Sequence, residues 1–97
     1  DFKYGLTEVT VAPFQKIRIN ANVQVVLVQN SSINKVFVEG DQRNLKNVII
    51  SSENGELVID AAAGFSANDQ LLLTIPAGNV KQVAIKGEAK VEGLAAR

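Results

Sequence analysis

The chain contains no cysteine, histidine, methionine or tryptophan among its 97 residues. Without cysteine it has no disulfide, no thiolate metal ligand and no cysteine nucleophile. Without histidine it lacks the usual general base near neutral pH and the commonest metal ligand. A Ser-His-Asp triad is therefore excluded in its usual form. These absences argue against an enzyme, and we expect no catalytic residue, no metal and no cofactor.

Excess charge and aromatic side chains are also lacking. Ten Lys and Arg residues balance ten Asp and Glu residues, and four Phe and one Tyr are the only rings. A neutral chain has no field that attracts nucleic acid, and few rings are present on which bases could stack. No apolar run approaches the roughly 20 residues of a membrane-spanning helix, and no signal peptide is present. We therefore expect neither a nucleic-acid partner nor a membrane span.

Alternating apolar residues dominate residues 14–40. Ile17, Ile19 and Val25 share one parity, whereas Lys16 and Arg18 share the other. This period of two is typical of strands with one buried face. Turn residues at 30–34 then precede a second alternating run, so the sequence predicts a β-hairpin over 14–40. The predicted core positions are Val25, Leu27, Val36, Val38, Ile59 and Ile75.

The remaining residues continue the strand pattern. A first strand is predicted over 6–11 after a frayed start, and one helical turn within 40–47, with Leu45 facing inward. Asn54-Gly55 predicts a tight hairpin between 48–52 and 56–60. A loop over 61–70, anchored by Phe65, precedes strands at 71–75 and 80–86 and a turn-and-strand unit at 87–94, with Val83 and Ile85 inward. Seven or eight short strands without a long helix predict an all-β sandwich, barrel or solenoid, although no strict repeat is found.

Five segments resemble, in the same order, the auto-transporter adhesin, head GIN domain family of bacterial secreted domains. They are FQKIRI at 14–19, VQVVLVQ at 23–29, KVFVEGD at 35–41 followed by Leu45, NGELVI at 54–59, and LTIPA with VAIKGEA within 73–89. The resemblance implies an all-β, right-handed β-helix-like (β-solenoid) fold, with a β-sandwich as the alternative. It also implies an extracytoplasmic binding module, an adhesin for a cell-surface glycan or protein. The family has no catalytic residues to transfer.

The chain departs from the family pattern in two places. Asn20-Ala21-Asn22 occupies a position where the family has Gly-rich residues. Family members also continue into further β-helical rungs. We therefore expect a lead-in strand at 1–13 and a head GIN-like domain at 14–97 that corresponds to the N-terminal part of the family domain.

Acidic and basic side chains supply the candidate binding residues. Glu39 and Asp41 flank Gly40, and Asp69 lies in a loop, but calcium sites need more oxygen ligands than these. Solvated turn residues are the favoured interpretation. Lys16 and Arg18 share an outward face, and a second basic group comprises Lys81, Lys86 and Lys90. They could meet anionic polysaccharide, although lysines also protect sheet edges.

The small and polar turn residues are given a structural role and not a functional one. Asn30-Ser31-Ser32 fits the N-glycosylation pattern, but a turn explains it better, and Gly87 and Gly93 are interpreted as corner glycines. Apolar residues continue close to the C-terminus at Val83, Ile85, Val91 and Leu94. We therefore expect a homo-oligomer through the C-terminal edge. This leaves a second functional hypothesis open, a structural self-assembling solenoid module resembling bactofilins.

Overall fold

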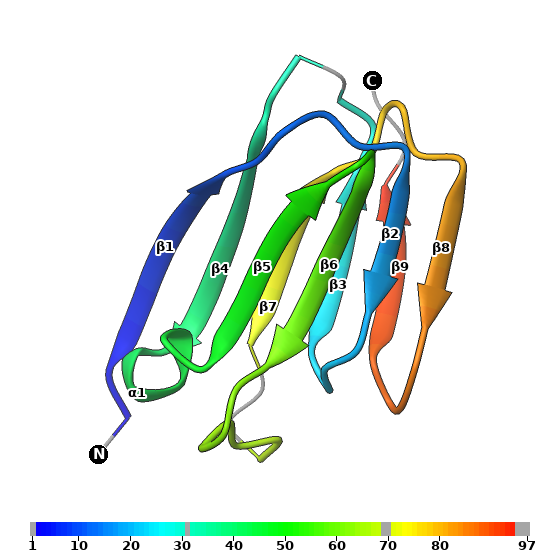
Figure 1. Ribbon diagram of the computed structural model, residues 1–97. Helices are drawn as coiled ribbons and strands as arrows, with labels where there is room; N and C mark the ends of the chain where they lie inside the picture. Colours follow the sequence, from blue (N-terminus) through cyan, green and yellow to red (C-terminus); the bar gives the residue numbers. More distant parts are fainter. Residues whose placement is uncertain (1, 31, 69–70, 95–97) are drawn as a thin grey trace.

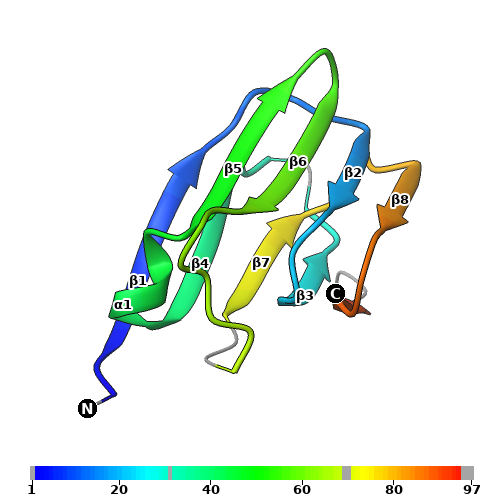
Figure 2. The same ribbon diagram turned by 60° about the horizontal axis from the view of Figure 1, so that its bottom comes forward.

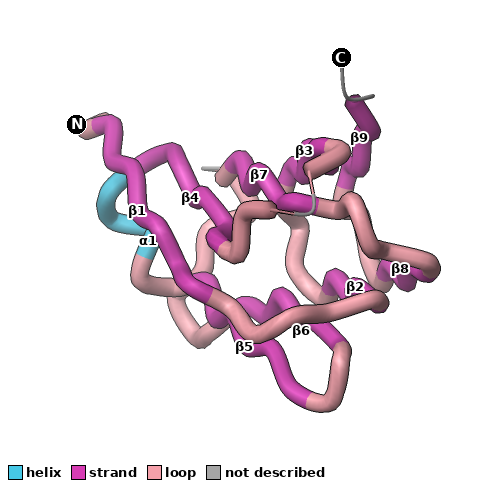
Figure 3. Tube along the Cα trace, turned by 90° about the horizontal axis from the view of Figure 1, so that it is seen from above, coloured by secondary structure: helices cyan, strands magenta, loops and turns pink. Residues whose placement is uncertain are grey.

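The computed structural model describes residues 2–30, 32–68 and 71–94, which fold into two facing β-sheets (Figures 1 and 3). Sheet A contains, in spatial order, β1 (Tyr4–Thr10), β4 (Lys35–Asp41), β7 (Leu72–Pro76), β3 (Gln24–Val28) and β9 (Lys90–Leu94). Sheet B contains β5 (Val48–Glu53), β6 (Glu56–Ala61), β2 (Lys16–Ile19) and β8 (Gln82–Ile85). Within the described residues the single helix is α1 (Gln42–Leu45). The all-β prediction is confirmed, and two unclosed sheets are compatible with a sandwich.

Three strand–corner–strand units, here called rungs, cross from sheet B to sheet A. They are β2–β3 (16–28), β6–β7 (56–76) and β8–β9 (82–94). All strand pairs between rungs are parallel, and the β2–β3 rung lies between the other two. The antiparallel strands β5, β4 and β1 extend the sheets beyond the β6–β7 rung. Figure 2 shows the order of strands in sheet B. Because the first rung in sequence is the middle one in space, successive rungs do not wind as a simple solenoid.

The β8–β9 rung repeats the β2–β3 rung residue for residue. Lys16 pairs with Gln82 and Gln24 pairs with Lys90, which is an offset of 66 residues in both strands. The corner between the strands therefore has the same length in both rungs. This repeat is not recognisable in the sequence, because only Ile19/Ile85 and Val25/Val91 are identical among the 13 aligned positions.

The core lies between the two sheets and follows the predicted alternation. Of the six predicted core positions, five are buried, and Leu27 is half-buried and packs against them. Each buried aliphatic side chain contributes about 1.5–3 kcal/mol by leaving water. The fully buried core residues include Ile17, Ile19, Val23, Val25, Val36, Val38, Leu57, Ile59, Leu71, Leu73 and Ile75. The alternation therefore identified the inner faces of the strands correctly.

The predicted hairpin over 14–40 is wrong. Strands β2 and β3 lie in different sheets, and β7 separates β3 from β4. Both partners of β3 are parallel strands that come from later in the chain. Alternation determines which face of a strand is buried, but it does not determine the neighbouring strand. The partners of β3 therefore could not be deduced from residues 14–40 alone.

The tight hairpin at Asn54-Gly55 is confirmed. Strands β5 and β6 are antiparallel, and φ is 55° at Asn54 and 79° at Gly55. Positive φ at both central residues is the geometry of the turn that Asn-Gly favours. In this case the partner is local, so turn chemistry alone specifies the pairing.

Strand β1 begins earlier than predicted, at Tyr4, and pairs with β4 from Tyr4 to Thr10. Gly5 allows α1 to approach this strand. A Cβ atom at Gly5 would lie 2.7 Å from both Leu45 Cδ1 and Gln42 Cγ. The predicted helical turn is present, and half-buried Leu45 packs against the core.

Candidate functional site

The acidic candidates have structural partners. Glu39 accepts a hydrogen bond of 2.9 Å from the Tyr4 hydroxyl. Asp41 is buried and accepts a hydrogen bond of 3.0 Å from the Arg43 backbone N–H at the start of α1. Asp69 lies outside the described residues. Across the described part of the chain, no three acidic side chains gather into a potential metal site.

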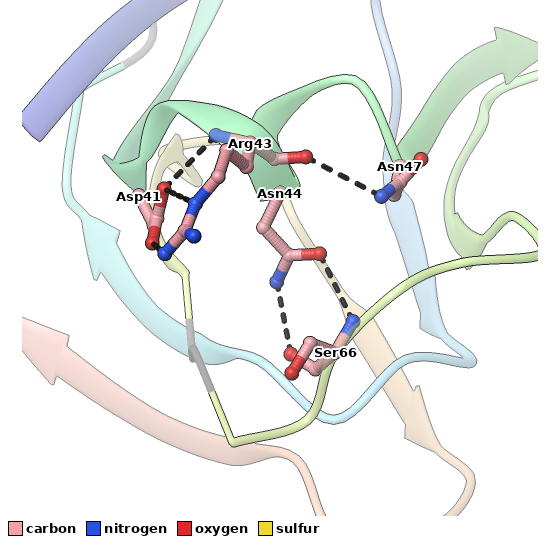
Figure 4. A network of polar contacts seen from close by, with 5 residues as sticks. All are labelled: Asp41, Arg43, Asn44, Asn47 and Ser66. Carbon is pink, nitrogen blue, oxygen red and sulfur yellow. Dashed lines mark hydrogen bonds and ion pairs between the residues drawn. The ribbon is translucent and has the colours of Figure 1, made fainter. Parts of the chain in front are cut away.

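Asp41 and Arg43 form the charged part of a polar network around α1 (Figure 4). The Arg43 guanidinium donates to both carboxylate oxygens of Asp41, at 3.1 and 2.6 Å. These hydrogen bonds stabilise the ionised carboxylate and lower the pKa of Asp41 from 3.8 to about 2. The network therefore keeps a charged cap on the helix over the ordinary pH range.

Two asparagines, one in α1 and one just after it, attach the loop that follows β6 to this region. The Asn44 amide exchanges two hydrogen bonds with the Ser66 backbone, at 2.9 and 3.0 Å (Figure 4). The Asn47 side chain donates to the Gly64 carbonyl at 3.0 Å. Phe65 packs against the core as predicted, but sequence reasoning missed these amide contacts. The Asn-rich run at 44–47 was the available signal.

Lys16 and Arg18 line a shallow groove of about 460 Å³ on the outer face of sheet B. Arg18 Nη2 lies 3.4 Å from Glu56 Oε2, and Glu53 lines the same groove. Two cations and two carboxylates leave the groove without net charge, so it has no electrostatic preference for anionic polysaccharide. The remaining lining residues are Ser51, Asn54 and Val58.

The second basic group is not a cluster. Lys81 and Lys86 flank opposite ends of β8, whereas Lys90 begins β9 in the other sheet.

Of the two predicted corner glycines, one lies in a corner and the other does not. Gly87 has a φ of 83° in the corner between β8 and β9, as a corner glycine requires. Gly93 lies within β9, so its assignment to a corner is wrong.

Four connecting segments meet at one end of the two facing sheets, at the top of Figure 1, and are called here the loop end. Their described residues are 11–15, 29–30 with 32–34, 54–55 and 77–81. Backbone hydrogen bonds connect them: Val11 N–H to the Asn34 carbonyl at 2.9 Å, Gln15 N–H to Gly55 at 2.9 Å, Gly78 N–H to Asn30 at 3.2 Å, and Lys81 N–H to Gln15 at 2.8 Å. The Ser52 hydroxyl also donates to the Ala12 carbonyl at 2.9 Å. The loops are therefore held in a defined arrangement.

The loop end contains a cleft of about 100 Å³, here called the loop cleft. Its lining residues are Val11, Ala12, Pro13, Phe14, Asn30, Ser32, Ile33, Asn34, Pro76, Gly78 and Asn79. Val11, Phe14 and Pro76 are buried and supply apolar surface, whereas exposed Asn34 and Asn79 supply side-chain amides. Within the described residues, neither of these two amides makes a hydrogen bond to the protein.

Asn30 has a structural role beside the loop cleft. Its Oδ1 accepts a hydrogen bond of 2.8 Å from the Ser32 N–H, which is the geometry of an Asx turn. Sequence reasoning identified this turn but missed the cleft. Asn, Pro and Gly marked each loop separately, whereas their convergence depends on the strand order.

The family model described as "Putative auto-transporter adhesin, head GIN domain" matches residues 13–95. The chain belongs to this family. No relative is found among curated proteins. In the described residues, no helix is long and apolar enough to cross a membrane.

Three solved structures have the same fold, and each is described as a putative adhesin. The protein from Bacteroides fragilis has 13% identity and a TM-score of 0.81, and the match covers 96% of this chain and 51% of that one. The protein from Parabacteroides distasonis has 17% identity, a TM-score of 0.79, and coverage of 96% and 40%. The protein from Parabacteroides merdae has 16% identity, a TM-score of 0.73, and coverage of 96% and 39%. The chain thus spans about half or less of the length of these structures.

Proposed function

We propose that this head GIN chain is a non-enzymatic, extracytoplasmic binding module that attaches to a cell-surface glycan or protein through its loop end. The observation that carries the proposal is the loop cleft, which four hydrogen-bonded segments hold at one end of the sandwich. Membership of an adhesin family supports surface binding. The absence of histidine and cysteine supports a role without catalysis.

The loop end suits recognition better than the groove on sheet B. Binding surfaces occur preferentially on loops that a rigid scaffold positions. Loops that are already ordered lose less conformational entropy when a ligand binds, so more of the contact energy appears as affinity. The charged side chains of the sheet B groove partly satisfy one another through the Arg18–Glu56 pair.

A binding screen tests this proposal. The protein is applied to an array of bacterial and host surface glycans and matrix proteins. Ala12→Trp places a large ring at the loop cleft, and Lys16→Ala changes only the sheet B groove. We expect retention by at least one ligand class, loss with Ala12→Trp and no change with Lys16→Ala. The reverse pattern would move the site to sheet B, and no retention on any array would contradict the proposal.

The stacked rungs support a finer description of the fold. We propose that the parallel β6–β7, β2–β3 and β8–β9 rungs are a β-helix-like stack within residues 14–97. The parallel register between neighbouring rungs favours this description, as do the equal corner lengths and the 66-residue offset of the β2–β3 and β8–β9 rungs. Under this proposal residues 14–97 correspond to the N-terminal part of a head GIN domain.

A second candidate function is self-assembly through the β8–β9 rung, as a structural module. Val83 and Ile85 are exposed although they face the same side of sheet B as buried Ile17 and Ile19. An antiparallel partner centred on Val91 would place Lys90 opposite Glu92 of a second copy. Light scattering across a dilution series tests this candidate, with Ile85→Lys expected to give monomers and Ile49→Lys on β5 as the control. A monomer at every concentration of the unmodified protein would contradict it.

A further inference from the structure

We infer that the loop cleft binds the acetamido group of an N-acetylated amino sugar. This inference rests on the proposed function, and it adds the chemical class of the ligand. Size, lining chemistry, absence of charge and rigidity of the cleft each support it.

The size of the loop cleft limits what can enter. Its volume is about 100 Å³. Pockets that enclose a whole small molecule have volumes of about 300–1,000 Å³. The cleft therefore does not enclose a whole sugar, whereas a projecting group of about four non-hydrogen atoms can enter it. An acetamido group has four such atoms, and the sugar that carries it would remain outside, over the surrounding loops.

The lining chemistry matches both parts of an acetamido group. Buried Val11 and Phe14 provide an apolar surface for the methyl group. Asn34 and Asn79 each offer amide donors and a carbonyl acceptor, which can pair with the C=O and N–H of the ligand. Their side chains make no competing hydrogen bond within the described residues.

The lining also excludes charged groups. Among the described residues that line the cleft, none is an Asp, Glu, Lys or Arg. A phosphate, carboxylate or free ammonium group would lose its hydration there without gaining an opposite charge. A hydroxyl group in the same position would leave the apolar surface without a partner. The acetamido group satisfies both kinds of lining residue.

Backbone hydrogen bonds connect the described segments that line the loop cleft. Hydrogen bonds join residue 11 to residue 34, residue 30 to residue 78, and Ala77 N–H to the Val28 carbonyl at 2.7 Å. The last of these continues the β3–β7 ladder into the loops. Weak ligand groups benefit most from such order, because little of their small binding energy is spent on ordering the protein.

Matched sugars test the inference. Chitooligosaccharides, the corresponding de-acetylated glucosamine oligomers and glucose oligomers of equal length are compared by array binding and by chemical-shift titration. We expect at least a tenfold preference for the acetylated series, with shifts confined to residues of the loop cleft. A peptide that carries N-acetyl-lysine is included, because the same acetamido chemistry also occurs in modified proteins.

Variants of single amides make the test specific. Asn34→Ala and Asn79→Ala should each weaken binding of the acetylated oligomers severalfold, and Ala12→Trp should abolish it. Asn68→Ala, in the loop at the opposite end of the sandwich, removes the same side chain outside the cleft and should change nothing. Circular dichroism verifies that each variant remains folded.

The outcomes separate this inference from the proposed function. Glycan binding that ignores acetylation but is lost with Ala12→Trp would overturn the acetamido assignment and leave the binding module in place. Preference for the acetyl-lysine peptide over every glycan would overturn the assignment to sugars. If no array ligand is retained at all, both the inference and the proposed function fail.

Discussion

The β2–β3 and β8–β9 rungs have the same length and register but very different burial. Ile17 and Ile19 are 1% and 0% exposed, whereas Val83 and Ile85, their partners in β8, are 37% and 46% exposed. All four side chains lie on the inner face of sheet B. The β2–β3 rung has a neighbouring rung on both sides, but within the described residues the β8–β9 rung has one on a single side. Burial in this fold therefore depends on the position of a rung in the stack as well as on strand alternation.

The corners of the two rungs show how they are joined. Asn22 Oδ1 in the β2–β3 corner accepts a hydrogen bond of 3.0 Å from the Glu88 N–H in the β8–β9 corner. At the following strands, half-buried Leu27 lies beside Gly93, which carries no side chain. The β2–β3 rung thus supplies the buried apolar side chains and the acceptor of the corner bond, whereas the β8–β9 rung supplies the donor and contributes less packing.

The largest expected difference in the free energy of unfolding is between alanine variants of Ile19 and Ile85, which pair with each other in sheet B. Ile19→Ala should lower the free energy of unfolding by about 2–5 kcal/mol, because it removes buried apolar surface and leaves a cavity. Ile85→Ala should cost less than about 1 kcal/mol, because the side chain is already half exposed. Denaturant midpoints measure both changes. Equal losses would mean that the two rungs are covered to the same extent in solution.

A smaller effect is expected at the corner bond. Asn22→Ala removes the acceptor for the Glu88 N–H, and it should cost about 0.5–1.5 kcal/mol. The amide of Glu88 should then exchange with solvent faster than in the unmodified protein. Hydrogen exchange at this amide provides the measurement, with Asn68→Ala as the control. Unchanged protection would show that the corner bond does not connect the rungs.

A gain is expected where the outer rung lacks a side chain. A Cβ atom at Gly93 would meet nothing within 4 Å, and φ at this glycine is not positive. Gly93→Ala should therefore raise stability by about 0.4–1 kcal/mol, chiefly by restricting the unfolded chain. Gly55→Ala is the matched control and should destabilise, because φ is 79° there. A loss of stability at Gly93 would indicate that this position is closely packed in solution.

Lowering the pH should reduce the stability of the protein without changing the difference between the two rungs, because Asp41 lies outside both of them. Its pKa falls from 3.8 to about 2 on folding, so its stabilising effect is complete above pH 4 and is lost as the pH falls from about 4 to 2. Asp41→Asn should reduce this acid dependence of the unfolding midpoint. The difference between Ile19→Ala and Ile85→Ala should stay constant over the same pH range. A pH-dependent difference would indicate that α1 is coupled to the rungs.

Local chemistry in the sequence determined the fold class, the inner faces of the strands and the Asn54-Gly55 hairpin. Each depends on neighbouring residues: alternation places Val25 and Ile59 on a buried face, and Asn-Gly adopts the positive φ values of a tight turn. Five resembling segments also identified the family, which the match over residues 13–95 confirms. The loops that form the candidate site were recognisable as turns, but not as parts of one cleft.

Only the tertiary structure decided which strands are neighbours. The interposition of β7 between β3 and β4, the 66-residue offset between two rungs and the convergence of Asn34 and Asn79 all join residues that are distant in sequence. A strand with alternating side chains can pair equally well with many others, because the backbone hydrogen bonds of the ladder are the same for every sequence. Packing of the whole core makes the choice, and the observed strand order buries Ile17, Leu57 and Leu73 together. The exposure of Ile85 has the same origin, because it depends on the neighbours of a rung and not on its own residues.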